Sequence, residues 1–338
     1  MRTIEWKGGT VLTIDQARLP NEVVHLKMSN CRQVASALKT MKIRGAPLIG
    51  VAAAYGLALT AYHSRAKRKE TLMREIEESA ELLRGTRPTA VNLFWAVDRV
   101  VKKARETLGD ADKVARVIVD EAQRMADEDV EVNRKIGEHG CKLIDDGDVI
   151  LTHCNAGALA TVDFGTALGV IRAAWKQGKK VRVVATETRP KLQGARLTAY
   201  ELKRDGIQIT LITDSMVGYV MSKRLISKVI VGADRIVRDA VINKIGTYTI
   251  AVLAHENGVP FYVAAPRSTF DVDRASEDAV IEERDPEEVT HFGSQRIVPS
   301  GVKALNPAFD ITPMKYVSAI ICETGILSST KFEKLTMV

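Results

Sequence analysis

The stretch Val149-Ile150-Leu151-Thr152-His153-Cys154-Asn155-Ala156-Gly157 shows the pattern on which the fold of this chain depends. A short apolar run ends in a small polar cluster, and further apolar runs occur at Val181–Ala185, Ile207–Ile212, Val229–Val231, Phe261–Val263 and Val317–Ile321. Four of the five gaps between these runs contain a segment long enough for a helix. Strands that alternate with helices at this spacing pair in parallel through right-handed crossovers. We therefore predict an α/β fold whose C-terminal part is a Rossmann-like, doubly wound parallel sheet.

The first part of the chain predicts a smaller, mostly helical domain with a short antiparallel sheet. Alternating segments at 2–6, 11–14 and 23–27 indicate strands, the first two joined through a hairpin turn at Gly8-Gly9. Apolar residues at helical spacing then predict helices at 31–41, from Pro47 onward, and at 69–83, 90–106 and 113–127, with Asn30 suited to cap the first. We place the domains at 1–128 and 129–338. The junction contains no Pro- or Ser-rich linker, which is compatible with a rigid helix.

Composition and charge limit the classes of partner. The chain has 338 residues, 46% of them hydrophobic, and its net charge of +7 favours anionic ligands. Acidic residues follow the densest basic run, Lys67-Arg68-Lys69, at once, so we predict a solvated helix face and no nucleic-acid partner. The residues from Gly45 to Tyr62 carry no charge but are rich in Ala and Gly. They predict a buried helix and not a membrane span.

The cysteines, Cys31, Cys141, Cys154 and Cys322, are widely spaced and include no Cys-x-x-Cys pair. No two histidines stand at metal-ligand spacing. This usage predicts neither a disulfide framework nor a metal site, and it is typical of the reducing cytoplasm.

Two of the polar clusters at predicted strand ends carry groups suited to catalysis. Ligands of doubly wound sheets bind beyond the carboxyl ends of the strands, and Cys154 follows the first apolar run while Asp234 follows the fourth. A thiol in such a loop can become reactive, although a free cysteine is often only a small buried hydrophobe. Apolar surroundings would keep Asp234 protonated and able to donate a proton. Alternatively, Asp234 caps the next segment or pairs with Arg235. His153 is expected to point to the face opposite Cys154.

Other segments offer donors for a phosphate group. Arg44-Gly45-Ala46-Pro47 supplies a guanidinium and free amides at a helix N-terminus, and Arg87 stands just before another helix. Gln193 lies in the cluster after the second apolar run, and Asn243-Lys244 precede a helix. Either arginine could instead form an interdomain ion pair, and an Asn-Lys pair alone is often ordinary surface. No Gly-x-Gly-x-x-Gly or Walker-type motif follows a predicted strand, so a phosphorylated small molecule is favoured over a nucleotide.

Several segments resemble the methylthioribose-1-phosphate isomerases, the aldose–ketose isomerases of methionine salvage. This family belongs to the superfamily of the alpha, beta and delta subunits of the translation-initiation exchange factor. The matching stretches cover nearly the whole chain in the family's order: Arg44–Pro47, Thr86–Leu93, Thr152–Thr161, Glu187–Pro190, Leu192–Arg196, Gly232–Arg235 and Asn243–Tyr248. There is one departure, between Asp234 and Asn243. The family usually has an Asn-Gly-Asp turn in this segment, whereas this chain has Arg238-Asp239-Ala240 and the segment is one residue shorter.

The resemblance implies a function and a set of residue roles. It implies a cytoplasmic homodimer that converts 5-methylthioribose 1-phosphate to 5-methylthioribulose 1-phosphate without cofactor or metal. Cys154 and Asp234 would be the catalytic pair, and the residues that hold the substrate would be Arg44, Gly45, Ala46, Arg87, Gln193, Asn243 and Lys244. Two alternatives are a ribose-1,5-bisphosphate isomerase, which needs donors for a second phosphate, and a non-catalytic regulatory subunit of the exchange factor. The segments around Arg44 and Arg87 favour the enzyme over the regulatory subunit.

Overall fold

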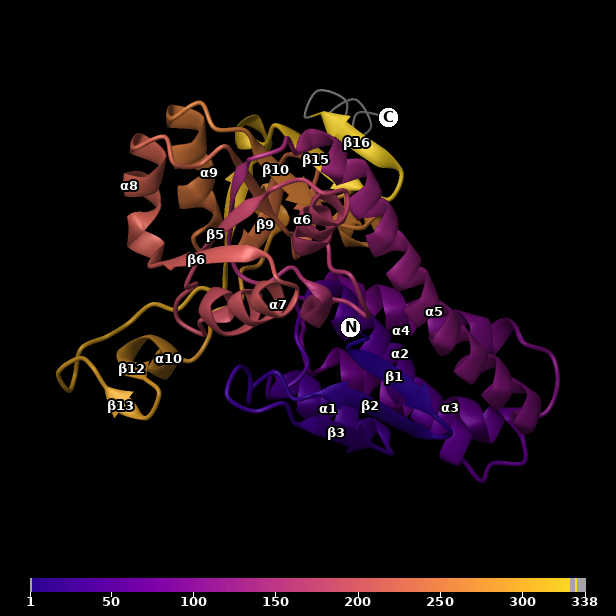
Figure 1. The fold of residues 1–338 in the computed structure, drawn as a ribbon. Helices are drawn as coiled ribbons and strands as arrows, with labels where there is room; N and C mark the ends of the chain where they lie inside the picture. The colour runs from indigo at the N-terminus through magenta and orange to yellow at the C-terminus, as the bar shows by residue number, and fades with distance from the viewer. Residues whose placement is uncertain (1, 329–331, 333–338) are drawn as a thin grey trace.

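The computed structural model describes residues 2–328 and 332 and has two parts joined by a long helix (Figure 1). The N-terminal part begins with an antiparallel sheet of β1 (Ile4–Lys7), β2 (Thr10–Ile14) and β3 (His25–Met28). Gly8 and Gly9 join the first two strands and both have positive φ, a conformation that glycine adopts without steric cost. The predicted hairpin is confirmed.

The helices of this part are α1 (Cys31–Lys39), α2 (Ala46–His63), α3 (Lys69–Arg84), α4 (Val91–Glu106) and α5 (Ala111–Gly140). Asn30 caps α1 as predicted, because its Oδ1 accepts a hydrogen bond from Gln33 N at 3.0 Å. Helix α2 packs against α4 and α5 in the N-terminal core. By length and composition it could cross a membrane, but 83% of its 18 residues are buried inside the protein. The prediction of a core helix is therefore confirmed.

Helix α5 continues without interruption from the N-terminal part into the sheet part. Its first half buries Val114 and Ile118 in the N-terminal core, whereas Ile136 packs beside the large sheet. The helix extends beyond the predicted end at 127 because the acidic residues there lie on its surface, where Asp127 pairs with Arg2 and Glu128 with Arg99. The boundary between residues 128 and 129 falls inside this helix, and the division of the domains at that position stays a prediction.

Asp129 ties α5 to the loop that precedes the next helix. Its Oδ2 accepts a hydrogen bond from Val162 N at 2.7 Å. Burial raises the pKa of Asp129 to about 7, and the charge of Asp163 adds to the rise, against the hydrogen bonds from Val162 and Asn133. An acid whose pKa is higher in the folded chain than in the unfolded chain takes up a proton on folding. Its contribution to stability is therefore lost as the pH rises from about 4 to about 7.

We expect Asp129→Asn to remove this pH dependence, because an asparagine oxygen still accepts from Val162 N but the side chain does not ionise. At pH 8 the variant should be more stable than the wild type by about 2 to 4 kcal/mol, since one pKa unit corresponds to about 1.4 kcal/mol. At pH 5 the gain should be much smaller. Urea unfolding at both pH values measures it, with Asp120→Asn on the exposed side of α5 as the control. An equal effect at the two pH values would contradict the expectation.

The C-terminal part is built on a seven-stranded sheet with the order β16-β15-β10-β7-β4-β5-β6. The strands are β4 (Val149–Thr152), β5 (Arg182–Thr186), β6 (Gln208–Ile212), β7 (Lys228–Val231), β10 (Phe261–Ala264), β15 (Ala319–Cys322) and β16 (Gly325–Ser328). All pairs are parallel except that of β15 with β16. Numbered along the chain, the parallel strands have the spatial order 3-2-1-4-5-6 of a Rossmann fold. Each predicted run is a strand of this sheet, and the predicted fold class is confirmed.

Alternate residues of the strands face two layers of helices. The helices are α6 (Ala167–Lys176), α7 (Ala199–Arg204), α8 (Val217–Ser222) and α9 (Thr247–Glu256), and a π-helical segment at Gly194–Thr198 leads into α7. Ile150 and Ile230 pack in one core with α6 and α7, whereas Leu151 and Val229 pack in another with α8 and α9. Single 3-10 turns lie at Cys141–Leu143, Ala158–Ala160, Asp214–Met216, Arg267–Thr269, Ser276–Asp278 and Met314–Tyr316.

The structure also contains a second sheet that the sequence patterns do not predict. Its order is β11-β8-β9-β14, with β11 (Phe270–Asp271), β8 (Arg235–Val237), β9 (Ala240–Lys244) and β14 (Phe309–Pro313). The remaining elements, α10 (Glu287–Thr290), β12 (His291–Phe292) and β13 (Gln295–Arg296), project from the body in Figure 1. The pairing of β9 with β14 sets Asn243 opposite Asp310 and Lys244 opposite Phe309. Asn243 and Lys244 thus end a buried strand and are not ordinary surface.

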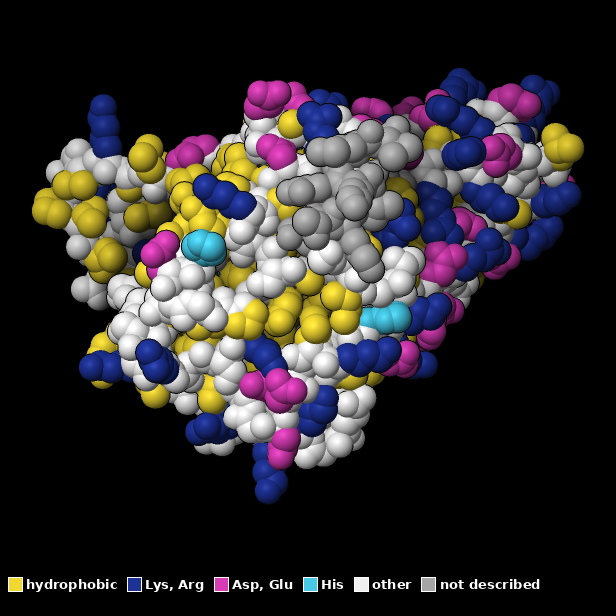
Figure 2. Space-filling model, turned by 90° about the horizontal axis from the view of Figure 1, so that it is seen from above, with side chains coloured by type: hydrophobic (Ala, Val, Ile, Leu, Met, Phe, Trp, Pro, Cys, Tyr) yellow, Lys and Arg dark blue, Asp and Glu magenta, His cyan; other side chains and the backbone are white. Residues whose placement is uncertain are grey.

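The surface over the N-terminal helices mixes charges of both signs. Figure 2, which looks down on the molecule, shows Lys and Arg side chains interleaved with Asp and Glu on the right of the view. Lys67 and Arg68 are exposed, as is Glu70 directly after them. Lys67 and Arg68 stand just before α3, so the basic run is solvated as predicted, although only Lys69 of the three belongs to the helix.

Candidate active site

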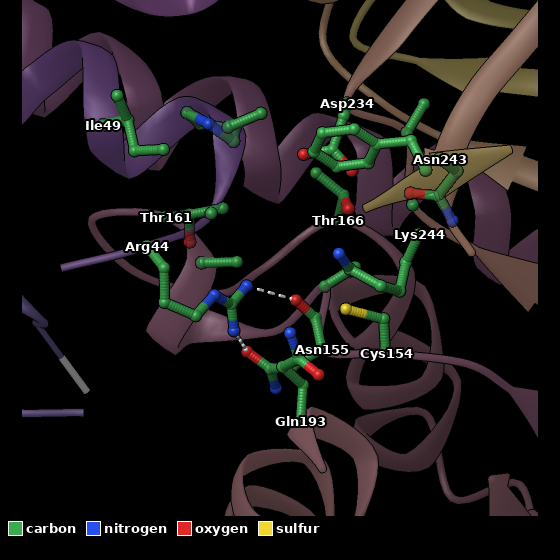
Figure 3. Close-up of a pocket in the computed structure, with 18 of the residues that line it drawn as sticks. Arg44, Ile49, Cys154, Asn155, Thr161, Thr166, Gln193, Asp234, Asn243 and Lys244 are labelled. Carbon is green, nitrogen blue, oxygen red and sulfur yellow. Dashed lines mark hydrogen bonds between the residues drawn. The ribbon is translucent and has the colours of Figure 1, made fainter. Parts of the chain in front are cut away.

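A cavity lies where the N-terminal part meets the carboxyl ends of the parallel strands. It opens at the switch point of the sheet, between β4 and β7. The strands that follow β4 lie on one side of this point, and those that follow β7 lie on the other. The residues predicted to form the site all line it: Arg44, Gly45, Ala46, Arg87, Cys154, Gln193, Asp234, Asn243 and Lys244. Figure 3 shows Arg44, Cys154, Asp234 and Lys244 arranged around a common centre. Cys154 and Asp234 therefore share one cavity although they are far apart in the sequence.

The backbone of Cys154 is held in an unusual conformation. Its φ is +61°, in the left-handed region that side chains other than glycine rarely adopt. Two threonines fix its peptide groups, because Cys154 N donates to Thr188 Oγ1 at 2.9 Å and Thr198 Oγ1 donates to Cys154 O at 2.6 Å. These contacts set the direction of the thiol at the end of β4. Strain held in this way by the surrounding structure is typical of functional sites.

The two candidate catalytic groups both favour their protonated forms. Burial raises the pKa of the Cys154 thiol, against the positive charges of Arg44 and Lys244, and the charge of Asp234 adds to the rise. Burial likewise raises the pKa of Asp234, against the charges of Lys244, Arg87 and Arg44. The apolar surroundings expected for Asp234 after β7 are thus consistent with its raised pKa.

Lys244 is placed by its strand partner β14. Its Nζ donates to Ala308 O at 2.6 Å and lies 4.6 Å from the centre of the Phe309 ring. Burial lowers the pKa of Lys244, whereas the charges of Cys154 and Asp234 raise it. Beside it, Asn243 Nδ2 donates to Thr247 Oγ1 at 3.0 Å. With Arg44 and Arg87, Lys244 makes the cavity electropositive, which suits a phosphorylated ligand.

Gly45 lets the start of α2 approach the sheet part closely. Its φ is +102°, and a Cβ at this position would lie 2.4 Å from Ala160 Cα. Only glycine fits such a conformation and such a contact. Ala46 and Pro47 begin the helix, so the unpaired N–H groups of its first turn lie beside the cavity. These free amides lie where an anion could be held, as the predicted phosphate cradle requires, and the binding role itself stays a prediction.

We expect Gly45→Ala to push the start of α2 away from Ala160 and to weaken substrate binding. A left-handed conformation costs a non-glycine residue about 1–2 kcal/mol, so KM should rise about tenfold and the melting temperature should fall by several degrees. Steady-state kinetics and thermal unfolding measure the two effects. Gly218→Ala, on α8 with no contact nearer than 3.9 Å to the added Cβ, is the control. Unchanged KM and melting temperature in Gly45→Ala would show that the close approach is unimportant.

Arg87 and Gln193 carry buried polar atoms that lack a protein partner. Among residues 2–328 and 332, Arg87 Nε and Gln193 Oε1 make no hydrogen bond. Such atoms are rare in proteins and require a partner, which a bound ligand would supply. Arg87 Nη2 also donates to Glu282 Oε2 at 3.3 Å, so one of the expected ion pairs is present beside the cavity. Within the same described residues, no group of three or more His, Cys, Asp or Glu is placed to hold a metal ion.

Sequence reasoning did not single out several residues that line the cavity. The polar ones are Asn155, Thr161 and Thr166, and the larger apolar ones are Met41, Ile49, Pro266 and Phe309. His153, which the sequence predicts to point away from Cys154, also lines this cavity. His153 bonds to Thr186 Oγ1 at 2.6 Å and to Ile245 O at 2.8 Å and makes no hydrogen bond to Cys154. The sequence could have identified Asn155 as a cavity residue, because it follows Cys154 in the same polar cluster at a strand end. The apolar wall comes from distant segments that carry no motif.

Comparison with known proteins places the chain in a class. Residues 42–329 match the Initiation factor 2 subunit family. Because this match covers most of the chain, the protein belongs to that family.

The relatives identify a particular branch of the family. Methylthioribose-1-phosphate isomerases of Desulforudis audaxviator and Thermotoga maritima are 51% and 52% identical, over 97% and 96% of this chain and 94% of each relative. The solved 5-methylthioribose 1-phosphate isomerase of Pyrococcus horikoshii superposes with a TM-score of 0.92 at 46% identity, covering 99% of this chain and 95% of that one. The resemblance seen in the sequence to methylthioribose-1-phosphate isomerases is thus confirmed.

A further structure carries a different description. The protein solved as translation initiation factor eIF-2B, subunit delta, from A. fulgidus has a TM-score of 0.89 and 49% identity over the full length of both chains. Both descriptions therefore occur among close relatives of this chain.

Proposed function

We propose that this protein is an aldose–ketose isomerase that converts 5-methylthioribose 1-phosphate to 5-methylthioribulose 1-phosphate. The observation that carries the proposal is the single cavity at the switch point of the sheet, lined by Cys154, Asp234 and three cationic side chains. The identity of 52% to an isomerase of this name, over 94% of its length, supports it. The apolar wall that includes Met41, Ile49 and Phe309 suits a methylthio group.

The chemistry begins with a ring that does not open by itself. A phosphate on the anomeric carbon blocks the spontaneous ring opening on which ordinary sugar isomerases rely. We propose that protonated Asp234 donates to the ring oxygen while the bond from carbon one to that oxygen breaks. The raised pKa of Asp234 keeps this proton available at neutral pH. After opening, the carboxylate accepts the proton that leaves the hydroxyl of carbon two as that carbon becomes the ketone.

Cys154 assists the transfer of hydrogen from carbon two to carbon one. The hydrogen either migrates with its electron pair to the electron-poor carbon one, or leaves as a proton to the sulfur of Cys154 in its thiolate form, which gives an enediolate-like species and then returns the proton to carbon one. Substrate deuterated at carbon two separates the two routes. Full retention of deuterium in the product excludes obligatory exchange with solvent, whereas complete washout argues against direct migration. The donors from both parts of the protein hold the sugar phosphate in place for either route.

The function is tested by incubating the purified protein with methylthioribose 1-phosphate and, separately, with ribose 1,5-bisphosphate, and following ketose formation by NMR. We expect rapid formation of methylthioribulose 1-phosphate and little or no reaction of the bisphosphate. Preferential turnover of the bisphosphate would instead identify a ribose-1,5-bisphosphate isomerase. That enzyme needs cationic donors for a second phosphate, whereas part of this cavity is apolar.

A regulatory role in translation initiation is the second candidate, because of the close relative described as a subunit of eIF-2B. The electropositive cavity with its buried unpartnered atoms favours the enzyme. No turnover of either sugar phosphate, combined with tight association with an initiation factor, would favour the regulatory role.

The oligomeric state and compartment belong to the same proposal. We propose that the protein is a homodimer in the cytoplasm, as the sequence resemblance implies. Light scattering of the purified protein should give twice the mass of one chain, and a single-chain mass at micromolar concentration would contradict the homodimer.

A further inference from the structure

A buried carboxylate organises the loop that carries Cys154. Glu201, on α7, has a side chain that is 1% exposed. It accepts hydrogen bonds from the backbone N–H groups of Ala158 and Leu159 at 2.7 and 3.2 Å, and from Arg172 Nη2 at 2.7 Å. A Cβ at Gly157 would lie 2.4 to 2.6 Å from the carboxylate atoms, so glycine is required there. Glu201 thus fixes the loop after β4 against α7.

Glu201 also holds the side chain of Asn155. Asn155 Nδ2 donates to Glu201 Oε1 at 2.9 Å and to Thr198 Oγ1 at 3.2 Å. This leaves Asn155 Oδ1 facing Arg44, whose Nη1 donates to it at 2.6 Å, while Arg44 Nη2 donates to the Asn155 backbone oxygen at 2.6 Å (Figure 3). The orientation of the amide is determined by its partners, because a guanidinium only donates and a carboxylate only accepts.

The charge of Arg44 is buried but not neutralised by contact with an acid. Arg44 is 7% exposed and lines the cavity. Within residues 2–328 and 332, no carboxylate forms an ion pair with it. Its two fixed contacts are oxygen atoms of Asn155, which are neutral. A neutral acceptor can direct a guanidinium without cancelling the charge that an anionic ligand would use.

We propose that Asn155 is a positioning residue for the isomerase reaction: fixed by Glu201, it aims the Arg44 guanidinium into the cavity so that its charge is available to the substrate phosphate. This inference rests on the proposed function of the cavity. It extends that proposal to a residue which acts through Arg44 and makes no contact of its own with the reacting atoms. Preorganisation of this kind lowers the entropy lost when the ligand binds.

A double-mutant cycle with Asn155→Ala and Arg44→Ala tests the coupling. A hydrogen bond to a charged group contributes about 1.5–3 kcal/mol, so Asn155→Ala should raise KM at least about tenfold, with a much smaller change in kcat. In the Arg44→Ala background the same substitution should raise KM less than about twofold. Fully additive effects would overturn the proposal. Asn133→Ala on α5, another buried asparagine, is the matched control and should leave KM unchanged.

Calorimetric titration with inorganic phosphate supplies a readout that does not depend on turnover. Phosphate affinity should fall in Asn155→Ala in parallel with the rise in KM. If the wild type binds phosphate but shows no isomerase activity, the proposed function fails while the positioning role remains under test. Wild-type protein that binds no phosphate, or equal phosphate affinity in Asn155→Ala, would overturn the positioning role.

Asn155→Asp distinguishes two effects: the direction of the Arg44 guanidinium, and the net charge that it offers to an anion. The aspartate keeps the shape and the acceptor for Arg44, but it adds a carboxylate beside Arg44 and faces Glu201 Oε1 with an oxygen in place of the donor. It should bind phosphate more weakly than Asn155→Ala, and wild-type affinity in this variant would contradict the proposal. Melting temperatures are measured for all variants. If Asn155→Ala does not fold, Asn155→Ser takes its place in the cycle.

Discussion

Asp234→Asn is expected to reduce kcat by about 10²- to 10⁴-fold, the usual contribution of a positioned general acid. The amide has nearly the shape of the carboxyl group but cannot transfer the proton that ring opening requires. Because Arg44, Arg87 and Lys244 remain in place, affinity for inorganic phosphate should change little. Turnover followed by NMR and phosphate titration by calorimetry measure the two effects.

The pH dependence gives an independent check on Asp234. Its proton is held more tightly than that of an ordinary aspartate because burial raises its pKa. The active form is the protonated one, so kcat/KM should be high below this raised pKa and fall as the pH rises through it. Asp239→Asn, in the turn between β8 and β9 outside the cavity lining, is the control and should keep the wild-type profile. Near-normal turnover in Asp234→Asn would remove this residue from the mechanism.

Cys154→Ala is expected to cause the second large loss, again about 10²- to 10⁴-fold in kcat, because the proposed mechanism gives this residue a part in moving hydrogen from carbon two. Alanine adopts the same backbone conformation at no greater cost than cysteine, and the contacts of the peptide groups to Thr188 and Thr198 do not involve the thiol. The melting temperature should therefore stay close to that of the wild type.

The control for this variant is Cys322→Ala, which removes a buried thiol in β15 away from the cavity lining. It should lose some stability and keep its turnover. Wild-type kcat in Cys154→Ala would assign Cys154 the structural role of a small buried hydrophobe that its residue type also permits.

The large sheet could be predicted because its central strands are buried on both faces and therefore read as unbroken apolar runs. The ends of these strands then meet at one edge, which is why Cys154 and Asp234 could be assigned to one site from local patterns alone. The position of Gly45 beside the cavity, at the start of a helix, followed from helix-end chemistry in the same way. Each of these inferences needs only a few neighbouring residues.

The second sheet could not be predicted, because β11 with β8 and β9 with β14 pair across long stretches of chain, and only β8 and β9 are joined by a short turn. β9 is joined to β14 through the register of Lys244 with Phe309, and β11 has only two residues. The role of Asn155 was missed for a related reason. Its contacts with Arg44 and Glu201 come from three separate segments, and no local pattern reports which way an amide group will turn.

The uninterrupted course of α5 constrains how a sugar phosphate can enter. At 1.5 Å per residue the helix is about 45 Å long, and it is embedded in the cores at both of its ends. A hinge motion that separates the two halves of the molecule would therefore require α5 to break, or one of its ends to leave the core in which it is packed. A ligand therefore reaches the cavity without a hinge opening between the two halves, and the start of α2 stays at a fixed distance from the strand ends.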